Sequence, residues 1–123
     1  MSLGTLSGRI GIVGTGVIGA SWSAYFLAKG FDVVASDPAD GAEERLRRLV
    51  EHYWPTLETL GLSKGASLHR LTFENNLDKA LAEVDFVQEN GPERLDIKRD
   101  LIAKIDAASP EDALIATSSS GIW

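Results

Sequence analysis

The chain has 123 residues, of which 44% are apolar and 24% are charged, and its formal net charge is -6. This length and composition predict one globular domain with a buried core. The negative charge argues against a nucleic-acid partner, because it would be repelled by a phosphate backbone. The sequence has no cysteine, which excludes disulfides, thiolate metal sites and cysteine nucleophiles and is compatible with the cytoplasmic location that we expect.

No apolar run approaches the roughly 20 residues that a membrane helix needs, and the N-terminus lacks a basic region followed by an apolar core. We therefore expect no membrane partner and no targeting segment. Residues 1–8 show neither a strand period nor a helix period, and we interpret them as a tail or an expression scar. The predicted domain is then 9–123.

The first elements form a strand, a glycine turn, a helix and a second strand. Residues 9–13 are a short apolar run that ends at Gly14, and 17–28 is a mostly apolar stretch that ends at a lysine and a glycine. Residues 31–36 are rich in β-branched and aromatic side chains, which indicates a strand. Two strands joined by a helix predict a parallel βαβ unit.

A long amphipathic helix is predicted from Ala42 onward, with Gly61 as its end. Its apolar side chains fall at helical spacing and are Leu46, Leu49, Val50, Tyr53, Trp54, Leu57 and Leu60. Pro55 lies inside this pattern and lacks an amide donor. We expect it to kink or split the helix, unless it begins a new turn.

The same alternation continues to the end of the chain. The further elements expected are a strand at 71–73, a helix at 77–82, a strand at 84–89, a helix from Leu95 to before Ser109 and a strand at 113–116. The pattern predicts an α/β fold with a Rossmann-type doubly wound parallel sheet. Because such a sheet would normally continue after the fifth strand, we expect it to be truncated at the C-terminal end.

A glycine motif connects the first strand to the first helix. The segment Gly14-Thr15-Gly16-Val17-Ile18-Gly19 matches G-x-G-x-x-G. In that pattern Gly14 makes a tight turn, Gly16 lets a pyrophosphate approach the backbone, and Gly19 lets the helix pack closely on the strand. The helix start offers amides and a partial positive charge to the pyrophosphate. The alternative is a tight turn without a ligand.

Asp37 ends the second strand and lies 18 residues after Gly19. Dinucleotide binding typically uses an acidic residue about 20 residues beyond the glycines. A carboxylate there can accept both hydrogen bonds of an adenosine ribose, and it disfavours a 2′-phosphate. The predicted cofactor is therefore NAD and not NADP. The alternative role of Asp37 is to cap the turn before Pro38.

Two later segments resemble the 3-hydroxyacyl-CoA dehydrogenase family. They are residues 85–98, which read DFVQENGPERLDIK, and 116–121, which read ATSSSG. Within the family, residues 53–58 (YWPTLE) and the Gln88-Glu89 pair before Pro92-Glu93-Arg94 are most similar to the carnitine dehydrogenase branch. The Gln-Glu form is also similar to the lambda-crystallin and gulonate dehydrogenase branch.

This resemblance implies roles for four further residues. Glu93 and Lys98 match a glutamate and a lysine near the ribose on the nicotinamide side of NAD. Ser120 matches the active-site serine that hydrogen-bonds the substrate hydroxyl, and Ser118 stands where many members carry an asparagine that faces the nicotinamide. Without the resemblance, the first two residues are typical of a solvated helix start and the serines of a cap or loop.

The resemblance also implies a reaction. A hydride would pass from C3 of a small-molecule 3-hydroxy substrate to NAD, while a histidine takes the hydroxyl proton and a glutamate orients that histidine. His52 and His69 match no catalytic position, so we expect the catalytic histidine to lie beyond this chain and the chain alone to be inactive. No metal site is expected.

The family carries a helical C-terminal domain, so we expect the parent protein to be a homodimer. Two other functions stay open. The parent could be a 3-hydroxyacyl-CoA dehydrogenase proper of fatty-acid oxidation, since a shared NAD scaffold says little about the substrate pocket. It could also be a non-catalytic, crystallin-like NAD-binding protein.

Overall fold

The computed structural model describes residues 8–91 and 95–117. Residues 1–7 of the expected tail lie outside the described residues. So do three residues to which the resemblance gives roles, which are Glu93, Ser118 and Ser120. The site is therefore built below from the glycine motif, Asp37, Lys98 and their neighbours.

Five parallel strands form one sheet in the order β3-β2-β1-β4-β5. The strands are β1 (Arg9–Val13), β2 (Asp32–Ser36), β3 (Leu71–Phe73), β4 (Phe86–Glu89) and β5 (Leu114–Thr117). This order confirms the predicted Rossmann-type parallel sheet. The chain moves outward from β1 to β3 and then returns to the other side of β1 with β4. In open parallel sheets ligands bind outside the carboxyl ends of the strands at such a switch point.

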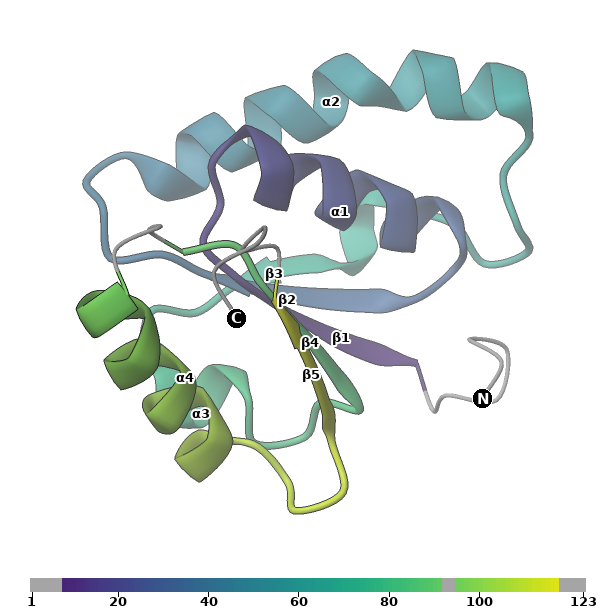
Figure 1. Ribbon diagram of the computed structural model, residues 1–123. Helices are drawn as coiled ribbons and strands as arrows, with labels where there is room; N and C mark the ends of the chain where they lie inside the picture. The colour runs from purple at the N-terminus through teal and green to yellow at the C-terminus, as the bar shows by residue number, and fades with distance from the viewer. Residues whose placement is uncertain (1–7, 92–94, 118–123) are drawn as a thin grey trace.

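Helices cover both faces of the sheet, so the molecule has three layers (Figure 1). On one face lie α1 (Val17–Ala28) and α2 (Ala42–Leu60), and on the other lie α3 (Leu77–Ala80) and α4 (Leu95–Ala108). A short 3₁₀ helix, η2 (Leu68–Arg70), precedes β3. Two helical layers explain why the strands are apolar on both sides.

The core has two parts, one under each helical layer. Successive strand residues point to opposite faces, so Ile12 and Val33 pack toward α1 and α2, whereas Val13 and Val34 pack toward α3 and α4. Fully burying a side chain of this size contributes about 1.5–3 kcal/mol. Apolar packing on both faces of the sheet therefore fixes the positions of the carboxyl ends of β1 and β2.

The structure differs from the predicted elements in several places. Strand β2 begins one residue later than predicted, β5 is shifted by one residue to Leu114–Thr117, and η2 was not predicted. Helix α2 continues past Pro55, so this residue does not split the helix, while the predicted kink stays a prediction. Pro55 and Glu51 are both exposed, so water can bond to the carbonyl that the missing amide leaves free. Helix α3 ends at Ala80 instead of residue 82, and β4 begins at Phe86 because the apolar Val84 belongs to the core packing before the strand.

Candidate functional site

The glycine motif and Asp37 meet at one pocket, at the switch point between β1 and β4. Its volume is about 430 Å³, which falls in the usual range for small-molecule sites of about 300–1,000 Å³. The described residues that line it are Val13, Gly14, Thr15, Gly16, Asp37, Pro38, Asn90, Gly91, Ile97, Asp100, Leu101 and Lys104. Four of the predicted cofactor residues are therefore brought together, namely Gly14, Thr15, Gly16 and Asp37.

Gly16 is the N-cap of α1, and the fold does not require a glycine there. Its φ of -69° and ψ of -162° are extended values that any residue can adopt. A Cβ atom built on Gly16 would meet nothing within 4 Å in the described part of the chain. Neither backbone strain nor packing explains this glycine, whereas space for a molecule from outside the chain does.

The other two glycines of the motif are needed by the fold itself. Gly14 has a φ of +92°, which L side chains rarely adopt, and a Cβ there would lie 2.8 Å from the carbonyl oxygen of Asn90. A Cβ on Gly19 would overlap the carbonyl oxygen of Gly14. These two residues form the turn and allow α1 to approach the strand closely.

Among the described residues, the backbone amides at the start of α1 lie outside the helical ladder, at the edge of the motif. The first intrahelical bond runs from the amide of Ala20 to the carbonyl oxygen of Gly16 at 2.8 Å. The amides of residues 17–19 therefore precede the helical ladder, where the helix carries a partial positive charge. Val17 and Ile18 are 63% and 57% exposed, and the first turn has no acidic side chain. This helix start can bind an anion without a basic residue.

The carboxylate of Asp37 is oriented by hydrogen bonds within the fold. Its Oδ2 accepts from the amide of Thr15 at 2.8 Å and from the hydroxyl of Thr15 at 3.2 Å, and its Oδ1 accepts from the amide of Ala39 at 2.9 Å. The bond to Ala39 is the turn cap expected in the alternative interpretation. A carboxylate has about four lone-pair positions, two on each oxygen. Both positions of Oδ2 and one of Oδ1 are filled, so Oδ1 can accept a further bond. Thr15, which is fully buried, thus fixes Asp37 at the pocket.

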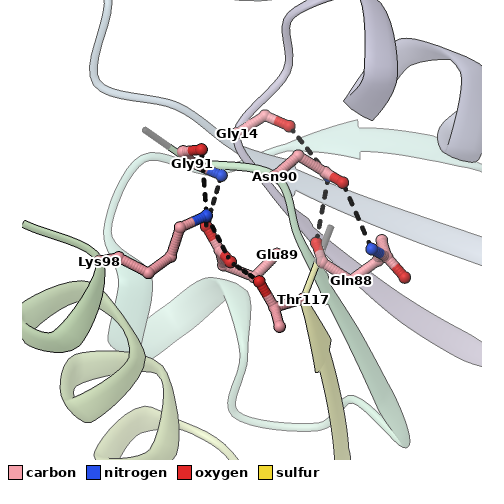
Figure 2. Close-up of polar contacts among 7 residues, drawn as sticks. All are labelled: Gly14, Gln88, Glu89, Asn90, Gly91, Lys98 and Thr117. Carbon is pink, nitrogen blue, oxygen red and sulfur yellow. Dashed lines mark hydrogen bonds and ion pairs between the residues drawn. The ribbon is translucent and has the colours of Figure 1, made fainter. Parts of the chain in front are cut away.

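Lys98 lies behind the pocket, and the structure does not place it among the lining residues. Its side chain is 1% exposed. Its Nζ donates to both carboxylate oxygens of Glu89, at 3.0 and 2.8 Å, and to the carbonyl oxygen of Gly91 at 3.1 Å (Figure 2). These contacts match the three donors of an ammonium group. The role of Lys98 beside a ribose therefore stays a prediction.

Glu89, the buried partner of Lys98, was missed as a candidate from the sequence. It is 0% exposed, and it also accepts from the hydroxyl of Thr117 at 2.6 Å and from the amide of Gly91. A signal for the pair was present in the sequence. Lys98 has helical spacing to the buried Ile105, and a lysine on a buried face needs an acidic partner.

Two further observations concern classes of site. Within residues 8–91 and 95–117, His, Asp and Glu side chains do not gather in a group of three or more that could hold a metal ion. Over the same described residues, every helix is too short or too polar to cross a membrane.

Comparisons with known proteins agree with this geometry. The family model described as 3-hydroxyacyl-CoA dehydrogenase, NAD binding domain, matches residues 9–123. The L-carnitine dehydrogenase of Streptomyces coelicolor is 58% identical over 92% of this chain and 36% of its own length. That of Bacillus cereus is 53% identical over 93% of this chain and 35% of its own length. The chain thus spans about a third of these relatives.

A solved structure adds a likeness of fold. The (S)-3-hydroxybutyryl-CoA dehydrogenase of Ralstonia eutropha has a TM-score of 0.80 and 28% identity, and the match covers 93% of this chain and 41% of that protein. The sequence comparison and the fold comparison therefore both find dehydrogenases that carry this NAD-binding domain.

Proposed function

This chain belongs to the family of 3-hydroxyacyl-CoA dehydrogenase NAD-binding domains, and we propose that it is the NAD-binding part of a dehydrogenase that oxidises a 3-hydroxy group. We propose L-carnitine as the substrate of the whole protein. The relatives named for L-carnitine share up to 58% of its sequence, compared with 28% for the Ralstonia protein named for an acyl-CoA substrate.

The conformation of Gly16 is the observation that best supports this function. The residue has no steric need to be a glycine, and it lies where a pyrophosphate must approach the backbone. A loop that served only as a tight turn would need Gly14 and Gly19 but would tolerate a side chain between them. The residues present therefore fit a dinucleotide.

Residues that line the pocket, together with the start of α1 that follows Gly16, would divide the work of holding NAD, which supplies the hydride acceptor when it is bound. The amides of Val17 and Ile18 would bind the pyrophosphate, because they lie at the positive end of α1. Asp37 would accept a hydroxyl of the adenosine ribose at its Oδ1 and repel a 2′-phosphate. The apolar side chains of Ile97 and Leu101, which line the pocket on the α4 side, would hold the adenine ring.

The roles on the nicotinamide side come from the resemblance alone. In this proposal Ser120 hydrogen-bonds the substrate hydroxyl, while Glu93 and Ser118 lie beside the nicotinamide half of the cofactor. The general base would be supplied by a part of the whole protein outside this chain, and the whole protein would be a homodimer. The chain alone would bind NAD without turning over substrate.

Calorimetric titration of this chain with NAD and with NADP, at equal concentrations, tests the cofactor. The proposal predicts saturable binding of NAD and much weaker binding of NADP. If a folded sample bound neither nucleotide, or bound both equally, the assignment of the glycine motif and Asp37 would be wrong.

A chimaera tests the reaction. This chain would replace the matching segment of the Streptomyces coelicolor L-carnitine dehydrogenase, with an Asp37→Ala version as a matched control. We expect the chimaera to reduce NAD when L-carnitine is added, and the control to need far more NAD. If a folded chimaera bound NAD but stayed inactive with L-carnitine, this chain would not fit that enzyme, and 3-hydroxybutyryl-CoA oxidation would become the better hypothesis for its parent.

A further inference from the structure

Glu89 and Lys98 form a buried ion pair that connects three elements at the carboxyl edge of the sheet. Glu89 ends β4, Lys98 lies in the first turns of α4, and Thr117 ends β5 and donates to the same carboxylate (Figure 2). The two charged side chains are 0% and 1% exposed. Burying two charges is costly, and well-packed apolar residues of similar volume often stabilise a fold as well or better. Stability alone is therefore a weak reason for this pair.

The pair forms hydrogen bonds with both backbone polar groups of Gly91, its N–H and its C=O. The amide of Gly91 donates to Oε2 of Glu89, and its carbonyl oxygen accepts from Nζ of Lys98 at 3.1 Å. Gly91 is also wedged sterically, because a Cβ there would lie 2.6 Å from Cδ2 of Leu101. Gly91 and Leu101 both line the pocket, whereas Glu89 and Lys98 are not among its described lining residues. The pair therefore acts on the pocket through the wall that Gly91 forms.

Asn90, the residue before Gly91, connects this wall of the pocket to the glycine motif. The amide of Asn90 donates to the carbonyl oxygen of Val13 at 2.8 Å. Its side-chain amide donates to the carbonyl oxygen of Gly14 at 3.3 Å, as Figure 2 shows. The carbonyl oxygen of Asn90 also lies where a side chain on Gly14 would have to be. A shift of Gly91 would thus disturb the turn that presents Gly16.

We infer that Glu89 is a positioning residue for the nucleotide pocket, and that it acts through Lys98 and Gly91 by fixing the part of the pocket wall that Gly91 forms. This inference rests on the proposed function, since the pocket is the one assigned to NAD. It assigns the pair to ligand affinity more than to stability, so the two properties should separate when the charges are replaced together.

The test compares two charge-free double variants of this chain with the wild type, by NAD calorimetry and thermal unfolding. In Glu89→Leu with Lys98→Met, both contacts to the Gly91 peptide are lost. In Glu89→Gln with Lys98→Met, the side-chain oxygen can still accept from the Gly91 amide. We expect both variants to unfold near the wild-type temperature. NAD affinity should fall by about tenfold or more in the leucine variant, which corresponds to about 1.4 kcal/mol of binding free energy or more, because Gly91 is no longer held in place. The fall should be smaller in the glutamine variant.

Wild-type NAD affinity in a folded leucine variant would overturn the inference, and so would equal losses of affinity in the two variants. If the leucine variant does not fold, Thr117→Val and Thr117→Ser replace it. Valine removes the hydroxyl that donates to Glu89, whereas serine keeps it, so only the valine variant should bind NAD more weakly at an unchanged unfolding temperature. Equal affinities for these two would overturn the inference. A wild-type chain that does not bind NAD would instead refute the proposed function.

Discussion

Two polar regions at the same edge of the sheet use their hydrogen-bonding groups in opposite ways. At the start of α1, the amides of residues 17–19 precede the helical ladder, and the side chains around them are exposed. At the end of β4, the carboxylate of Glu89 accepts from Lys98, Thr117 and Gly91 and is closed off from solvent. The first region can bind something else, while the second is satisfied within the chain.

This difference shows how a ligand site can be distinguished from a structural cluster that is equally polar. The ligand site keeps donors directed outward and small residues where the fold does not need them, as at Gly16. The structural cluster uses its donors internally and orients the backbone of the site. Each region therefore predicts a different response to substitution.

The largest expected effect is on the buried pair. Lys98→Met alone leaves the charge of Glu89 buried without its cation, which should lower the free energy of unfolding by about 3–5 kcal/mol. Lys104→Met is the matched control on the same helix. Its ion pair with Asp100 is largely exposed, so its loss should change stability by less than about 1 kcal/mol. Urea unfolding measures the free energy of unfolding of both variants. Similar small losses of stability in the two would show that the ion pair of Glu89 and Lys98 is not a structural cluster.

Gly19→Ala should cause the next largest loss of stability. The added Cβ would overlap the carbonyl oxygen of Gly14, and overpacking of this kind costs about 1–3 kcal/mol. Ser21→Ala, on the exposed side of the same helix, serves as the control and should be nearly neutral. Thermal unfolding of both variants tests this prediction. An unchanged unfolding midpoint for Gly19→Ala would mean that α1 does not lie as close to the backbone of Gly14 as it does in the structure.

Asp37→Ala should mainly weaken NAD binding. Hydrogen bonds to a charged group contribute about 1.5–3 kcal/mol, so the dissociation constant should rise by about tenfold to a hundredfold. Ser120→Ala should have a much smaller effect, because its proposed contact is with the substrate. Calorimetry with NAD compares them, and equal effects of the two substitutions would refute the assignment of Asp37.

Much of the fold could be predicted from local patterns. Alternating strands and helices, with breaks at glycine and proline, were enough for the order of elements and for the parallel sheet. The boundaries were less predictable, because Val84 is apolar for packing beneath the sheet and not for pairing in β4. The continuation of α2 through Pro55 depends on solvent exposure, which the sequence pattern does not give.

The site was predictable only in part, for a physical reason. The glycine motif and Asp37 carry a local spacing that reflects ligand geometry. Two other contacts join residues from separate elements, namely the hydrogen bond between Thr15 and Asp37 and the ion pair between Glu89 and Lys98. Such contacts form only when the sheet brings those elements together, so the local sequence pattern does not predict them.

The most direct test of the ligand site compares two glycine substitutions, Gly16→Val and Gly61→Ala, by NAD affinity and unfolding temperature. Gly16 has ordinary dihedral angles, whereas Gly61 has a φ of +103° and ends α2 away from the pocket. We predict that Gly16→Val loses NAD affinity while stability falls by no more than about 1 kcal/mol, because valine is a poorer N-cap than glycine. Gly61→Ala should keep NAD affinity and lose about 1 kcal/mol through backbone strain. Wild-type NAD affinity in Gly16→Val would contradict the account, because the space at Gly16 would then not be the space that the nucleotide uses.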